Sequence, residues 1–125
     1  MPNERMRALR WGHEMLQELC GDTMVSDGDR ARAAELLRTY PAPDAVSEWI
    51  HKNVACIPIN AASAIEGTGT LLRSIWYSEA CPPQLRHNLK FTLRHFPDPG
   101  AAVLRTDGRG AVSIRTWLLP ENHFG

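Results

Sequence analysis

The chain has 125 residues, 43% of them hydrophobic, and a formal net charge of zero from 14 basic and 14 acidic side chains. This length and composition predict a single globular domain, residues 1–125, with a core of its own, and they exclude a disordered chain. Basic and acidic side chains are spread over both halves, so the strongly basic face of most duplex-binding proteins is not expected. No apolar run approaches the ~20 residues of a membrane span, and the start, "MPNERMRALRWGHEM", lacks the apolar segment of a secretory signal.

Three cysteines, Cys20, Cys56 and Cys81, are widely spaced, and no C-x-x-C occurs. An odd number at such spacing predicts neither a disulfide framework nor a zinc site. Free thiols are typical of a reducing compartment, so we expect a cytoplasmic protein with no metal or other cofactor.

Two helices are predicted in the first third of the chain. Apolar residues recur at helical spacing over residues 3–20. The second helix follows "SDGD", in which Ser26 and Asp29 form a weak capping box, and Pro41 stops it. The short link between the two helices favours an antiparallel helical hairpin over about residues 3–41.

The middle segment, residues 42–62, mixes element types. "PAPDAVSEWIHKN" predicts a short third helix, and "VACIPIN" is an edge strand or extended segment because Pro58 cannot donate to a central ladder. A helix is expected next at 71–77, and Gly67 and Gly69 leave its start open.

A second helical hairpin is expected over about residues 63–97. Its second helix is "PPQLRHNLKFTLRHF", which has proline in the first turn and ends at Pro97. The tail predicts a β-hairpin over residues 101–117, turning at Asp107-Gly108 and pairing Val103 with Val112. The predicted fold class is therefore α+β: two antiparallel helical hairpins, a short extended segment and a C-terminal β-hairpin.

One motif, L-R-x-[YF]-P-x-P, occurs twice. It is "LRTYPAP" from Leu37 and "LRHFPDP" from Leu93, and the two copies lie 56 residues apart. An internal duplication explains this, because two hairpins packed together bury a common core; independent use of the same helix-ending chemistry explains it too. The shared Arg38 and Arg94 are either a paired anion site or cations that favour the negative ends of two helix dipoles.

The opening "PNERMRALRWGHEMLQEL" followed by "AAELLRTYP" resembles a family of small uncharacterised proteobacterial proteins. Their chains begin P-x-E-R-x-R-A and reach a second helix that ends L-L-R-H-[YF]-P. The resemblance covers about residues 2–46, and "TLRHFP" at residues 92–97 echoes it. It implies a bacterial cytoplasmic origin and transfers no catalytic or binding residue.

The best candidate for phosphate or partner contact is a basic face on the last helix. Arg86, Lys90 and Arg94 stand at i, i+4 and i+8, so they form a stripe. Arg105 and Arg109 on the predicted β-hairpin could extend it. A solvated basic face is the simpler interpretation of the same pattern.

Other candidate sites have weaker patterns. Trp117 is a candidate interaction anchor, since tryptophan is enriched at binding hot spots. Cys81 precedes a helix start, which favours a reactive thiol, with His87 as its only nearby base. "EGTGT" at 66–70 could cradle an anion but lacks the lysine of a P-loop.

No paired carboxylates, metal-ligand spacing or nucleophile motif indicates an enzyme. We therefore expect a non-enzymatic protein-interaction or accessory module that binds an unknown protein partner or a second copy of itself. The alternative is a nucleic-acid-binding regulator that uses the basic helix face.

Overall fold

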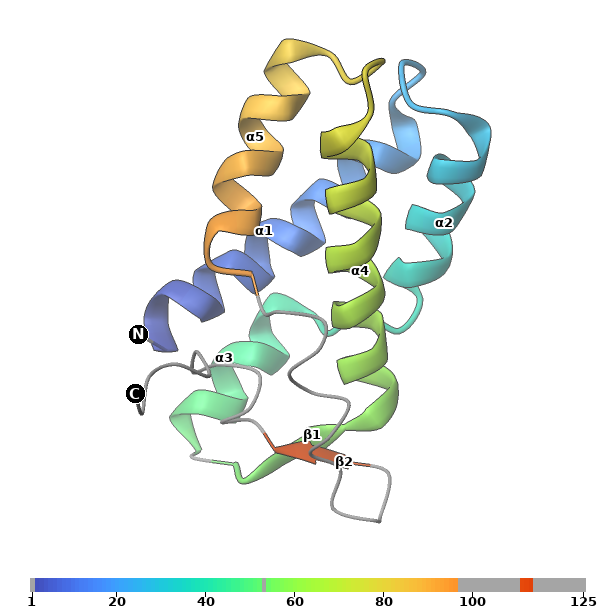
Figure 1. Cartoon of the computed structure of the whole chain (residues 1–125). Coiled ribbons are helices and arrows are strands. Elements are labelled where there is room, and N and C mark those ends of the chain that lie inside the picture. The colour runs from blue at the N-terminus through green and yellow to red at the C-terminus, as the bar shows by residue number, and fades with distance from the viewer. Residues whose placement is uncertain (1, 53, 97–110, 114–125) are drawn as a thin grey trace.

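The computed structural model describes residues 2–52, 54–96 and 111–113. Within these ranges the chain forms helices and two short strands (Figure 1): α1 Pro2–Gly21, α2 Asp27–Leu37, α3 Pro43–His51, β1 Cys56–Pro58, α4 Ile59–Tyr77, α5 Pro83–Arg94 and β2 Ala111–Ser113.

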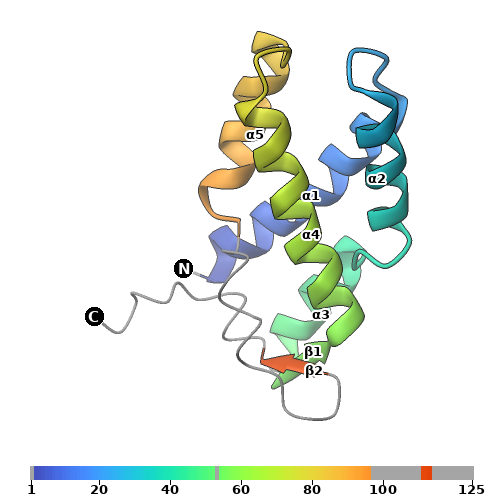
Figure 2. The ribbon, with the colours of Figure 1, turned by 45° about the vertical axis from the view of Figure 1, so that its right-hand side comes forward.

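Four of the helices enclose one core. Helix α4 lies between α5 and α2, and α1 crosses this layer and contacts all three (Figures 1 and 2). Leucine and isoleucine side chains from α1, α4 and α5 are almost fully buried where these helices meet: Leu9, Leu16, Leu19, Ile65, Leu72 and Leu89. Helix α3 packs against α1 at one end of the bundle.

Several predicted helix boundaries are confirmed. The Ser26 hydroxyl accepts a hydrogen bond from the Asp29 backbone N–H at 3.2 Å, so it caps the first turn of α2. The short third helix exists as α3 and buries Val46. Pro83 occupies the first turn of α5, where a missing N–H leaves no hydrogen bond unmade.

The helix expected at residues 71–77 is longer than predicted. Helix α4 begins at Ile59 rather than Leu71, and it passes through Gly67 and Gly69 without a break. A Cβ at Gly67 would lie 2.8 Å from Leu36 Cδ2, and one at Gly69 would lie 2.9 Å from Arg73 Nη1. Gly67 thus lets Leu36 of α2 pack closely against α4, and this tertiary contact offsets its poor helix propensity, whereas the nearest atom to Gly69 belongs to a flexible side chain of the same helix.

The predicted α+β class is wrong, because the described residues are mostly helical and the helices supply the core. The turn of the expected β-hairpin at Asp107-Gly108 lies outside the described residues. Val112 pairs antiparallel with Ile57 of β1, and its predicted partner Val103 also lies outside the described residues. Ile57 is buried, so β1 lies against the helical core. The free edge of β1 provides the backbone groups with which β2 forms hydrogen bonds.

Two pairs of helix boundaries are 56 residues apart, which is also the distance between the two copies of the repeated motif. Helix α1 ends at Gly21 and α4 at Tyr77, while α2 begins at Asp27 and α5 at Pro83. The two motif aromatics also meet. A Cβ at Gly12 would lie 2.6 Å from Tyr40 Oη and 2.7 Å from Phe96 Cε2, so both chain exits dock on one position of α1.

Tyr40 attaches the segment that follows α2 to α1. Its hydroxyl donates to the Leu9 carbonyl at 2.6 Å, and the side chain is buried. Burial raises the pKa of the Tyr40 phenol well above its ordinary value of 10.0. The folded protein therefore keeps Tyr40 neutral at pH values where the unfolded chain ionises it.

Tyr40 should make stability fall in alkaline solution. Below about pH 10 both states hold the proton and the contribution is fully present; above it the unfolded chain loses the proton, so stability declines by up to about 1.4 kcal/mol per pH unit. Tyr40→Phe should cost about 1 kcal/mol at neutral pH, from the lost hydrogen bond, and should flatten the alkaline decline. Urea unfolding at a series of pH values measures both effects. Tyr77→Phe, at an exposed side chain, should keep the wild-type slope.

Candidate functional site

The predicted basic face lies on the surface of α5. Arg86, Lys90 and Arg94 are all exposed. The Arg86 guanidinium donates to the Ser78 carbonyl at 2.9 Å, so it also braces the turn between α4 and α5. Within the described part of the chain, Lys90 and Arg94 have no hydrogen bond or ion pair.

The other candidates divide between described and undescribed residues. Arg105, Arg109 and Trp117 lie outside the described ranges. Cys81 is buried, and its thiol faces the Pro82 carbonyl at 3.6 Å. Residues 66–70, "EGTGT", lie inside α4 and not in a loop, so the possible anion cradle does not form there.

Arg38 and Arg94, the arginines of the repeated motif, are exposed at the ends of α2 and α5. In the described ranges no hydrogen bond or ion pair links them. The motif aromatics turn inward to Gly12 while the arginines face solvent, which is the arrangement expected of helix-ending residues.

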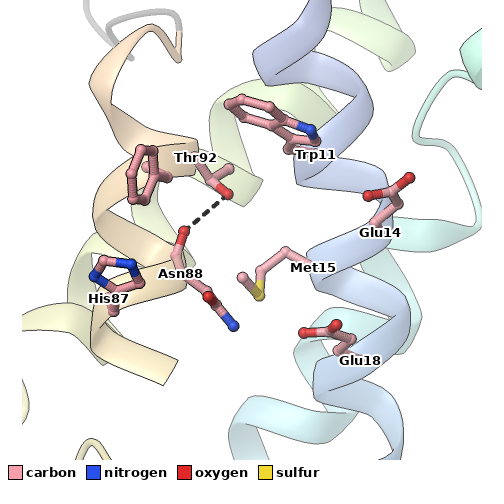
Figure 3. Close-up of a pocket in the computed structure, with 8 residues that line it drawn as sticks. Trp11, Glu14, Met15, Glu18, His87, Asn88 and Thr92 are labelled. Atoms are coloured by element: carbon pink, nitrogen blue, oxygen red, sulfur yellow. Dashed lines mark hydrogen bonds between the residues drawn. The ribbon is translucent and has the colours of Figure 1, made fainter. Parts of the chain in front are cut away.

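A groove runs between α1 and α5 (Figure 3) and encloses about 530 Å³. Half of its lining comes from each helix: Trp11, Glu14, Met15 and Glu18 from α1, and His87, Asn88, Phe91 and Thr92 from α5. Met15 extends from α1 into the space between the helices (Figure 3), and its side chain is almost fully buried. Met15 thus gives an apolar side chain to the floor of a groove whose mouth opens to solvent.

The sides of the groove carry aromatic and acidic side chains. Phe91 is 52% exposed and its ring meets that of His87 edge to face at 5.0 Å. Glu14 and Glu18 stand one turn apart on the α1 side, both exposed and both without an ion pair within the described ranges. An exposed aromatic beside unpaired carboxylates favours a ligand that has an apolar and a cationic part.

A hydroxyl also lies in the groove lining. Among the described residues that line it, Thr92 alone carries a hydroxyl, and that hydroxyl donates to the Asn88 carbonyl at 3.1 Å. No group of three histidine, cysteine, aspartate or glutamate side chains that could hold a metal ion occurs among residues 2–52 and 54–96 whose side chains are placed.

Sequence reasoning missed this groove. Phe91 lies opposite the Leu85 and Leu89 stripe on α5, and an aromatic residue on the polar face of a helix is the signal that could have indicated a binding surface. The pairing of α5 with α1 was not available from the sequence, because it depends on how distant helices pack.

No family model, curated protein or solved structure matches the chain. The resemblance to the proteobacterial family therefore stays a prediction. None of the described helices is long and apolar enough to cross a membrane.

Proposed function

We propose that this protein is a non-enzymatic protein-interaction module of the bacterial cytoplasm and that the α1–α5 groove is its binding surface. The partner is a protein segment with an apolar side chain for the groove floor and a cationic side chain for the acidic edge that Glu14 and Glu18 form. The exposed ring of Phe91 above an apolar floor is the observation that carries this proposal.

Physical arguments support a protein as the ligand. Aromatic residues and methionine are enriched in the buried centres of protein interfaces, and this groove contains Trp11, Met15 and Phe91. Covering an exposed phenylalanine removes apolar surface from water at roughly 25 cal/mol per Å². The unpaired carboxylates on one side add orientation and selectivity for a cation, since electrostatic complementarity fixes register more than affinity.

A photo-crosslinking analogue of phenylalanine at position 91 tests the proposal in the native cells. We expect one predominant protein adduct, identified by mass spectrometry, and its loss when Glu14→Lys and Glu18→Lys are added together. The matched control places the same analogue at Met24, which is 70% exposed and lies outside the groove. Equal adducts at both positions, or no protein adduct at position 91, would contradict the proposal.

A second function, single-stranded nucleic-acid binding, is favoured by a different surface. Trp76, Arg86 and Lys90 help to line a second hollow of about 560 Å³, and His87 borders both this hollow and the groove. Tyr77 is 74% exposed and its ring packs on Trp76 at 4.8 Å. Aromatic rings for stacking beside cations for phosphates are the usual elements of such a site.

Charge reversal at Lys90 and Arg94 should decide this second function. If it holds, a single-stranded oligonucleotide shifts on a gel at low salt, and Lys90→Glu with Arg94→Glu abolishes the shift. Arg38→Glu is the control, because Arg38 occupies the same position as Arg94 in the other copy of the repeated motif. If the wild-type protein does not shift the oligonucleotide, nucleic acid is eliminated as the ligand.

A further inference from the structure

The outer face of α1 carries charges of opposite sign at its two ends. Arg7, Trp11, Glu14 and Glu18 follow each other at i, i+4, i+7 and i+11, so they lie in one stripe along the helix. The two carboxylates and Trp11 also line the groove, which places the stripe at its edge.

None of these charges has a partner in the part of the chain that the structure describes. Arg7, Glu14 and Glu18 are exposed, and within the described ranges none makes an ion pair or hydrogen bond through its side chain. Trp11 between them is only partly buried. An ordered row of cation, aromatic ring and two anions on a 20-residue helix is therefore free to meet another surface.

Such a row is complementary to itself when reversed. In a two-fold dimer with the α1 helices antiparallel, Arg7 faces Glu18 of the second copy, and Trp11 faces its Glu14. The same two contacts recur on the other side of the axis, because two-fold interfaces repeat every contact. Arg7 and Glu18 are eleven residues apart, about 16 Å along the helix, so the two ion pairs flank the aromatic centre without crowding it.

We infer that the partner of the groove is a second copy of this chain, docked through antiparallel α1 helices. This rests on the proposed function, because it names the occupant of the same surface. Phe91 and Trp11 of both copies form the apolar centre, and Arg7 supplies the cation that Glu18 lacks in the single chain. A net charge of zero means that no overall repulsion opposes the association of two copies.

Sedimentation equilibrium of the full chain tests the inference by exchanging charges. Arg7→Glu alone and Glu18→Arg alone should each weaken the dimer by roughly tenfold or more, since each change creates two like-charge pairs. The double variant Arg7→Glu with Glu18→Arg should recover most of the wild-type affinity. Phe91→Ser should also dissociate the dimer, whereas Tyr77→Ser, which removes an even more exposed aromatic outside the groove, should not.

Circular dichroism of each variant distinguishes dissociation from unfolding, and the recovery in the double variant excludes a folding defect as its cause. A wild-type chain that remains monomeric at all concentrations, or a double variant as weak as the single ones, would overturn the inference. If the chain is monomeric while position 91 crosslinks a different protein, the second copy is ruled out and the proposed function stands. If no crosslink forms either, both are wrong.

Discussion

Gly12→Val is expected to destabilise the fold by about 3 kcal/mol. The Cβ of any residue at this position would lie 2.6 Å from Tyr40 Oη and 2.7 Å from the Phe96 ring, both shorter than real Cβ contacts. Neither group can retreat cheaply. The Tyr40 hydroxyl is held by its hydrogen bond to the Leu9 carbonyl, and Phe96 is buried.

The control for this prediction is Gly28→Val. Gly28 is in the first turns of α2, and a Cβ there would meet nothing within 4 Å. Its valine variant should stay within about 0.5 kcal/mol of wild type, because valine is a slightly better helix former than glycine. Urea unfolding of the two variants compares them directly. A Gly12→Val protein as stable as the Gly28→Val protein would mean that Tyr40 and Phe96 do not dock on α1.

Leu72→Ala should cost about 3 kcal/mol, and Leu16→Ala should cost a similar amount. Leu16 on α1 and Leu72 on α4 are 56 residues apart, and both are 0% exposed. Truncating either removes buried apolar surface and leaves a cavity where helices from the two halves meet. Met24→Ala, at a 70% exposed side chain, should change stability by less than about 0.5 kcal/mol.

Chemical denaturation monitored by far-UV circular dichroism provides the free energies for these leucine variants. Similar losses at Leu16 and Leu72 are expected because the two halves share one core. A loss of less than about 1 kcal/mol at either position would show that the half concerned packs loosely.

Local signals in the sequence predicted the helix ends well. Ser26 caps α2, Pro41 follows its end, and Pro83 starts α5, because each of these residues acts on its own backbone neighbourhood. Gly67 and Gly69 misled the prediction of α4. Their local preference is against a helix, and the close approach of Leu36 from α2 explains the glycine at position 67 only once the helices are packed.

Long-range pairings were the part that the sequence could not provide. Asp107-Gly108 favours a local turn, and nothing near Val112 indicates that its partner is Ile57. The basic stripe on α5 was found, because spacing within one helix is a local pattern. The groove was not found, because Phe91 lines it only when α5 packs beside Trp11 and Met15 of α1.

Oxidative footprinting with hydroxyl radicals tests most directly whether the α1–α5 groove is a binding surface. Trp11 and Phe91 should be oxidised readily in dilute purified protein and protected inside the native cells, whichever protein covers them. Met24 and Tyr77, which are exposed outside the groove, should be oxidised to the same extent in both conditions. Equal oxidation of all four residues in dilute protein and in cells would contradict the account.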